Sequence, residues 1–163
     1  MNFRIVCVGK LKERYLRDAE GEYFKRLSRF GAVSVTELKE APVPVGASLA
    51  EEAAAVRLEG SAILKALASV NRNNHYVIAL DREGKDLSSE ELADKISSLA
   101  VDGKSAVAFV IGGSLGLSGE VRNAADYALS FGRKTYPHQL MRVILAEQIY
   151  RACKISAGET YHK

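Results

Sequence analysis

The chain has 163 residues, of which 47% are hydrophobic and 26% are charged, and its formal net charge is +3. This length fits one domain over residues 1–163 with a sizeable core, and the composition excludes an intrinsically disordered chain. No apolar run approaches the length of a membrane span, and the N-terminus begins a strand pattern rather than a signal peptide. We therefore expect a cytoplasmic protein with no membrane partner.

The first third of the chain has the pattern of strand, helix and strand. Residues 3–8 and 33–38 are strand candidates, and an amphipathic helix with many basic residues is predicted over about residues 13–29. The basic residues of this helix form either a solvated face or a face that contacts phosphates. Two prolines then make residues 41–48 a stiff loop.

The middle of the chain continues this alternation. A long helix over about residues 49–67 precedes a buried strand at residues 76–80. Ser88 followed by Glu91 is a capping box, which predicts a helix that reaches about residue 100.

Residues 105–118 are an apolar run that breaks abruptly into glycine. Within it, residues 107–111 are uninterrupted and rich in β-branched and aromatic side chains, which is typical of a strand buried on both faces of a parallel sheet. Gly112 and Gly113 then give the backbone freedom to turn or to let a ligand approach closely. Because ligands of open α/β sheets bind outside the carboxyl ends of strands, this is either a ligand site or a plain strand-to-helix turn.

The C-terminal part supplies a short helix capped by Ser118, a strand at residues 128–131, and a last helix from Pro137 or His138 to about residue 155. Strands that alternate with helices predict an α/β fold with a mostly parallel sheet and helices on both faces. The last helix is hydrophobic nearly all round, so we expect a second subunit to cover part of it.

Motifs for other chemistries are missing or incomplete. Residues 102–105 end like a phosphate-binding P-loop but lack the upstream glycine, and no dinucleotide fingerprint follows the first strand. Cys7 and Cys153 lie far apart in apolar segments, with no Cys/His spacing for a metal, so we interpret both as reduced core residues and expect no metal. His138 and Arg142 are four residues apart on one helical face, for which a structural and a functional role are equally open.

Several sequence blocks taken together resemble the RlmH family, the 23S rRNA pseudouridine-N3 methyltransferases of the SPOUT superfamily, over the whole chain. The blocks are Val8-Gly9-Lys10-Leu11-Lys12, Val110-Ile111-Gly112-Gly113-Ser114 with Gly116-Leu117, Tyr127-Ala128-Leu129-Ser130-Phe131, Tyr136-Pro137-His138-Gln139 with Met141-Arg142-Val143, Glu147-Gln148-Ile149-Tyr150-Arg151-Ala152, and Tyr161-His162-Lys163.

This resemblance implies a single SPOUT domain whose C-terminal part is threaded as a trefoil knot, an exception to the rule against knots, and a homodimer. It also implies S-adenosyl-L-methionine as cofactor, bent in the knot and held by three loops that follow strands. Carried over to this sequence, the residues of these loops are Leu80, Gly112, Gly113, Phe131, Gly132, Arg133, Lys134, Thr135 and Tyr136.

For catalysis, the N3 proton of the target base has to leave before that nitrogen becomes a good nucleophile. We expect Arg142 to stabilise negative charge on the ring carbonyls, and His138 to orient the base or move the proton. Tyr161 and His162 are expected to reach the site from the tail of the same or of the partner subunit, where they stack on or bind the target base.

The expected partner is 23S rRNA in the large ribosomal subunit or in the assembled ribosome. From Phe131 onward the chain has six basic and two acidic residues, so an RNA-binding face is expected around the knot and the nearby basic helix. A non-catalytic ribosome-binding or assembly protein that retains the fold is the alternative. A nucleotide-binding enzyme of other chemistry is the third interpretation.

Overall fold

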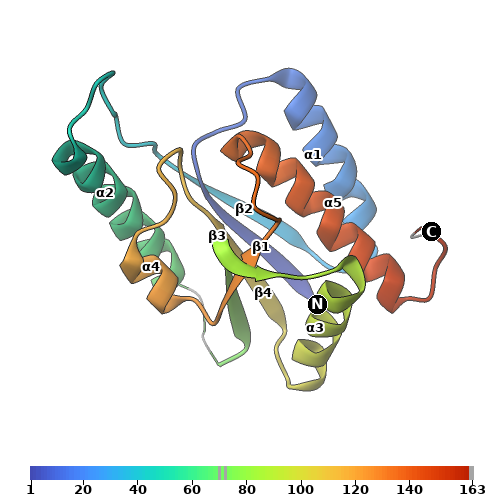
Figure 1. Cartoon of the computed structure of the whole chain (residues 1–163). Coiled ribbons are helices and arrows are strands. Elements are labelled where there is room, and N and C mark those ends of the chain that lie inside the picture. Colours follow the sequence, from blue (N-terminus) through green and yellow to red (C-terminus); the bar gives the residue numbers. More distant parts are fainter. Residues whose placement is uncertain (70, 72, 162–163) are drawn as a thin grey trace.

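The computed structural model of the chain describes residues 1–69, 71 and 73–161. In this part of the chain, strands and helices alternate from the N-terminus to the C-terminus (Figure 1). The elements in chain order are β1 (Asn2–Val8), α1 (Arg14–Leu27), β2 (Val33–Leu38), α2 (Leu49–Ala68), β3 (His75–Asp86), α3 (Ser89–Val101), β4 (Ala106–Ile111), α4 (Gly119–Ala124), β5 (Tyr127–Ser130) and α5 (His138–Ser156).

The strands form one five-stranded sheet in the order β2-β1-β4-β3-β5, and every pairing in it is parallel. β4 lies in the centre between β1 and β3, and all six of its residues are buried. This confirms the predicted parallel sheet and the doubly buried central strand. The carboxyl ends of β3, β4 and β5 therefore lie side by side at one edge of the sheet.

Helices cover both faces of the sheet (Figure 1), as the alternation predicted. On one face the core joins α1, α3 and α5 to the strands, with Leu27, Ile96 and Ile149 among its buried side chains. On the other face α2 and α4 contribute Ile63, Leu67 and Val121. No helix in the described part of the chain is long and apolar enough to cross a membrane.

Capping hydrogen bonds from nearby side chains define where several helices begin. Ser88 and Glu91 form the predicted capping box at the start of α3, and the Ser118 side chain accepts a hydrogen bond from the Val121 amide at the start of α4. Ser48 and Glu51 form a second capping box at the start of α2. Ser48 is the last residue of the stiff proline loop.

β3 extends further than its apolar pattern indicated. The predicted strand ends at Leu80, whereas the observed strand continues to Asp86 and pairs with Leu129 twice, once through Leu80 and once through Lys85. The intervening residues 81–84 leave the ladder as a bulge. The extension is polar and joins β5 only through its backbone, so a pattern of buried side chains could not reveal it.

Both cysteines are free, as expected: Cys7 is buried and Cys153 is half-buried. Burial raises the pKa of each thiol to about 11, because the thiolate loses its hydration in the core.

We expect both thiols to react slowly with iodoacetamide at pH 8 in the folded protein. A rise from 9.0 to about 11 in pKa lowers the thiolate fraction roughly 100-fold at that pH. Mass spectrometry after timed alkylation measures this, with the protein unfolded in urea as the control. Equal alkylation rates in the folded and unfolded protein would contradict the burial of these thiols.

Candidate active site

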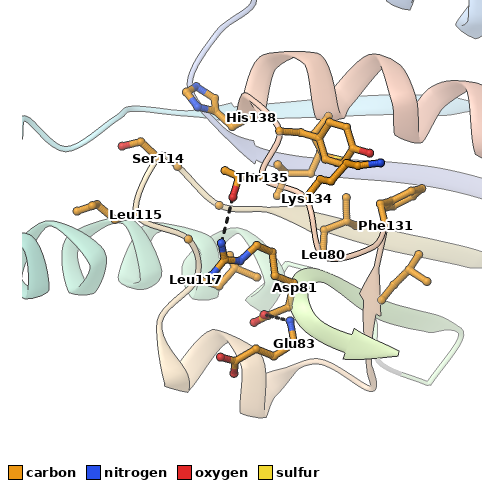
Figure 2. A pocket seen from close by; sticks show the side chains of 18 of the residues that line it. Leu80, Asp81, Glu83, Ser114, Leu115, Leu117, Phe131, Lys134, Thr135 and His138 are labelled. Carbon is orange, nitrogen blue, oxygen red and sulfur yellow. Dashed lines mark hydrogen bonds between the residues drawn. The ribbon is translucent and has the colours of Figure 1, made fainter. Parts of the chain in front are cut away.

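A cavity of about 370 Å³ opens where the carboxyl ends of β3, β4 and β5 meet the start of α5 (Figure 2). Ligands of open parallel sheets bind at such a position. The cavity is lined by Leu80, Asp81, Arg82, Glu83, Ile111, Gly112, Gly113, Ser114, Leu115, Gly116, Leu117, Arg122, Leu129, Phe131, Gly132, Lys134, Thr135, Tyr136, His138 and Met141.

The glycine turn after β4 forms the floor of the cavity. A Cβ on Gly112 would lie 2.7 Å from the carbonyl oxygen of Gly116, and a Cβ on Gly113 would lie 2.6 Å from Oε2 of Glu59. The Gly116 amide donates to the Gly113 carbonyl at 3.0 Å and closes the turn. No larger residue fits at either position without moving the backbone or the buried Glu59 carboxyl group.

The loop between β5 and α5 forms one wall and is held in place by hydrogen bonds. Ser130 Oγ donates to the Arg82 carbonyl oxygen at 3.2 Å and accepts a bond from the Gly132 amide at 3.1 Å. Arg82 Nη1 donates to Thr135 Oγ1 at 3.0 Å (Figure 2). These bonds tie the bulge of β3 to this loop, so the two walls keep a fixed spacing.

The cavity combines an apolar part with a charged rim. Figure 2 shows Leu80 and Phe131 on one side of the cavity and Ser114 and Leu115 on the other. On the rim, Arg122 Nε lies 2.7 Å from an oxygen of Asp81, and Lys134 is exposed. A cavity with an apolar part and several polar groups that converge on it is typical of sites for small organic ligands.

His138 lies at the cavity, as expected for a residue that acts in the site. It is the first residue of α5, and its side chain is 20% exposed. Its Nε2 atom lies 3.1 Å from Glu40 Oε1, an acidic partner that the sequence alone did not single out.

Arg142, which is expected to contact the reacting base, does not line the cavity. Its side chain is 3% exposed and donates to both carboxylate oxygens of Glu20 at 2.9 Å and to Glu37 at 2.7 Å. These hydrogen bonds and the charges of Glu20 raise its pKa against the opposing effect of burial. The cluster ties α5 to α1 and β2, which gives Arg142 a structural role in this chain.

Tyr161 does not line the cavity of its own chain either. The ring of Tyr161 packs edge-on against Tyr150 with centroids 4.9 Å apart, and its hydroxyl donates to Glu147 at 3.2 Å. Burial and the Glu147 charge raise the pKa of Tyr161 to about 12. His162 lies outside the described residues.

Of the residues expected to bind a cofactor, all except Arg133 line the cavity. Sequence reasoning missed the acidic rim residues Asp81 and Glu83, although their position directly after a buried strand was a usable signal. The partners of His138 and Arg142 lie far away in sequence and carried no local signal.

Comparisons with known proteins agree on one family. The family described as "Predicted SPOUT methyltransferase" matches residues 1–162. Proteins named ribosomal RNA large subunit methyltransferase H are similar over all of this chain and all of their own length: 57% identical in Clostridium novyi, and 52% identical in Alkaliphilus oremlandii and in Clostridioides difficile.

A solved structure, a probable methylase family protein from Haemophilus influenzae, has a TM-score of 0.54 and 14% identity. The match covers 99% of this chain and 70% of that one. At this identity the likeness supports the fold alone.

Replacement of Arg142 by alanine should destabilise the protein by about 3–5 kcal/mol, because the buried Glu20 carboxylate would remain without its partner. Urea denaturation followed by circular dichroism measures this. Arg14→Ala, which removes an exposed pair with Asp18 at 3.5 Å, is the control and should cost only about 0.3–0.5 kcal/mol. An equal decrease in the free energy of unfolding in both variants would contradict the structural role of Arg142.

Proposed function

The chain belongs to the SPOUT methyltransferase family, and from this premise we propose that it acts as one domain in the cytoplasm, transferring a methyl group from S-adenosyl-L-methionine to N3 of a pseudouridine in 23S rRNA. The observation that carries the proposal is the cavity at the carboxyl ends of β3, β4 and β5. The names of the relatives support the large-subunit rRNA as substrate.

The residues around the cavity fit this cofactor. Leu80, Leu117 and Phe131 offer apolar surfaces for the adenine ring, and the backbone groups of Gly112 and of residues 131–136 are available as polar partners. When bound, the cofactor supplies a methyl group that its sulfonium has already activated. The chain therefore has to orient the base, exclude water and accept a proton.

Different residues of the chain carry out the proton transfer and the positioning of the substrate. His138 lies at the cavity and is the group we assign to move the N3 proton. The exposed side chains of Arg133 and Lys134 stand on the loop between β5 and α5, where they can contact phosphates of the rRNA. Loss of the N3 proton turns a weak nucleophile into a competent one, and alignment of the base supplies a proximity effect.

A homodimer is part of this proposal. α5 is about 28 Å long, and Tyr161 contacts the half of the helix opposite to His138, so the tail of one chain would serve the cavity of a second copy. The Lys12 amide donates to Gln139 at 2.9 Å, which places the first turns of α1 and α5 together. Tyr15, which is 68% exposed, and Leu140, which is 38% exposed, lie on these turns and offer an apolar surface to a partner.

We also propose that α5 is threaded as the C-terminal trefoil knot. Support comes from the close crossing of the β3 bulge and β5: a Cβ on Gly84 would lie 2.7 Å from the backbone of Ala128. The hydrogen bond from Ser130 to the Arg82 carbonyl oxygen fixes the same crossing. Because the β3 bulge and β5 are held this close together, the chain that follows β5 has only a narrow route to α5.

Calorimetry should show that the protein binds S-adenosyl-L-methionine and that Gly112→Val lowers the affinity by about 10-fold or more, or ~1.4 kcal/mol, since the new side chain displaces the turn. Gly21→Val is the matched control, because nothing lies within 4 Å of the added Cβ on α1. It should bind normally.

Methyl transfer from labelled cofactor to ribosomes that lack the modification tests the reaction itself. We expect label in the large-subunit rRNA at N3 of one pseudouridine. Binding without transfer to any ribosomal substrate would favour an assembly protein that retains the fold. Absence of binding, with affinity for nucleoside phosphates instead, would favour a different nucleotide enzyme.

A further inference from the structure

Three segments that are distant in sequence meet at the imidazole of His138. They are the end of β1 at Gly9, the segment after β2 that carries Glu40, and the first residue of α5. Nε2 of His138 lies 3.1 Å from Glu40 Oε1. Gly9 has a φ of +86°, and a Cβ there would lie 3.1 Å from His138 Nε2 and 3.2 Å from Glu40 Oε1, so glycine leaves room for the pair.

The segment that carries Glu40 is itself held in place. The amide of Ala41 donates to Glu59 Oε1 at 2.9 Å, and Glu59 is a buried residue of α2 whose other oxygen lies against Gly113. Glu59 thus connects the position of Glu40 to the glycine turn of the cavity. Burial raises the pKa of Glu59, and the bond from Ala41 opposes that rise.

Nε2 of His138 has an unusual status. Within residues 1–69, 71 and 73–161, it and Asn74 Oδ1 are the buried side-chain polar atoms without a hydrogen bond. The Glu40 oxygen lies within ion-pair distance, but the bond is not aligned. Catalytic hydrogen bonds are often misaligned in the free enzyme and tighten when substrate binds, so a buried nitrogen of this kind points to a role in the reaction.

Both acidic and basic side chains lie near the His138 ring. Glu40 and Glu59 are the acidic groups that face His138, and Lys12 Nζ lies 3.8 Å from Glu40 Oε2 with a side chain that is 68% exposed. Arg142, one turn later on α5, is neutralised by Glu20 and Glu37. Across the cavity, Arg122 is paired with Asp81, while Lys134 points to solvent.

We propose that Glu40 is a positioning residue for methyl transfer: its carboxylate orients the His138 imidazole and stabilises the cation that forms when this ring takes the N3 proton of the target base. This inference rests on the proposed function. A carboxylate only accepts hydrogen bonds, so it holds the proton of the neutral ring on Nε2 and leaves Nδ1 as the basic atom.

The proton transfer balances without a further reactant. The N3–H bond breaks, its proton joins Nδ1 of His138, and its electron pair stays on N3. That pair then forms the bond to the methyl carbon, while the electrons of the broken sulfur–carbon bond remain on sulfur. The imidazolium next to Glu40 later loses its proton to water.

The test compares the full chain with Glu40→Gln by ¹H–¹⁵N NMR of the histidine rings and by kinetics. The chain has three histidines, and a His138→Gln spectrum assigns the signal of interest. In Glu40→Gln the ¹⁵N signals of the neutral His138 ring should no longer show the proton held on Nε2 alone, because the ring loses the carboxylate that accepts it. The kcat of methyl transfer should fall about 10-fold or more, with the KM for the cofactor unchanged.

Asp94→Asn is the matched control, since it removes an exposed carboxylate on α3 and should change neither value. Transfer by the unaltered protein is measured first: if that is absent, the proposed function fails, and the NMR spectra still test the contact between Glu40 and His138. A folded Glu40→Gln protein with unchanged His138 ring signals or unchanged kcat overturns the inference.

If Glu40→Gln does not fold, the variant Lys12→Met tests the inference instead. This exposed side chain competes with His138 for Glu40, so its removal should leave the ring proton held on Nε2. A ring proton that moves away from Nε2 in that variant overturns the inference.

Discussion

The chain makes a tight turn over Gly113–Gly116 directly after β4, and the geometry of the cavity depends on this turn. Gly112 packs against the Gly116 backbone and Gly113 against the Glu59 carboxyl group, so the turn has no room for a side chain. Because β4 is the central strand, its end lies between the ends of β1 and β3. The loops after β3 and β5 then close around the same point and create the cavity.

One helix serves two separate purposes in this arrangement. At its start, α5 presents His138 to the cavity, where Glu40 is its nearest charged partner. One turn later, Arg142 turns into the protein and binds Glu20 and Glu37. The buried cluster fixes the helix to α1 and β2 and thereby fixes the position of His138. The cavity residue and the structural cluster thus lie on neighbouring turns of the same helix.

Much of the fold could be predicted from the sequence, because hydrophobic period and capping residues are local signals. The central strand, the capping box at Ser88 and the glycine turn after β4 were all predicted in this way. The polar extension of β3 was not, since residues 85–86 join the sheet through backbone bonds that no side-chain pattern encodes. Most of the cofactor loops were carried over from the family resemblance, and the structure brings them together at one cavity.

The roles of individual polar residues were harder to predict. Spacing alone placed His138 and Arg142 on one helical face, but their partners come from α1, from β2 and from the segment after β2. Such long-range pairs decide whether a charged side chain is buried in a structural cluster or left at a cavity. Arg142 is therefore buried in a cluster away from the cavity, whereas His138 lies at the cavity, and the catalytic roles expected of both residues stay predictions.

The central claim is that the cavity at the ends of β3, β4 and β5 binds the methyl donor. The most direct measurement is an amide NMR titration of the protein with S-adenosylhomocysteine, the product form of the cofactor. The account predicts the largest shifts at Leu80, at Gly112 and Gly113, and over residues 131–136. Absence of shifts there, or shifts concentrated on a distant element such as α3, would contradict it.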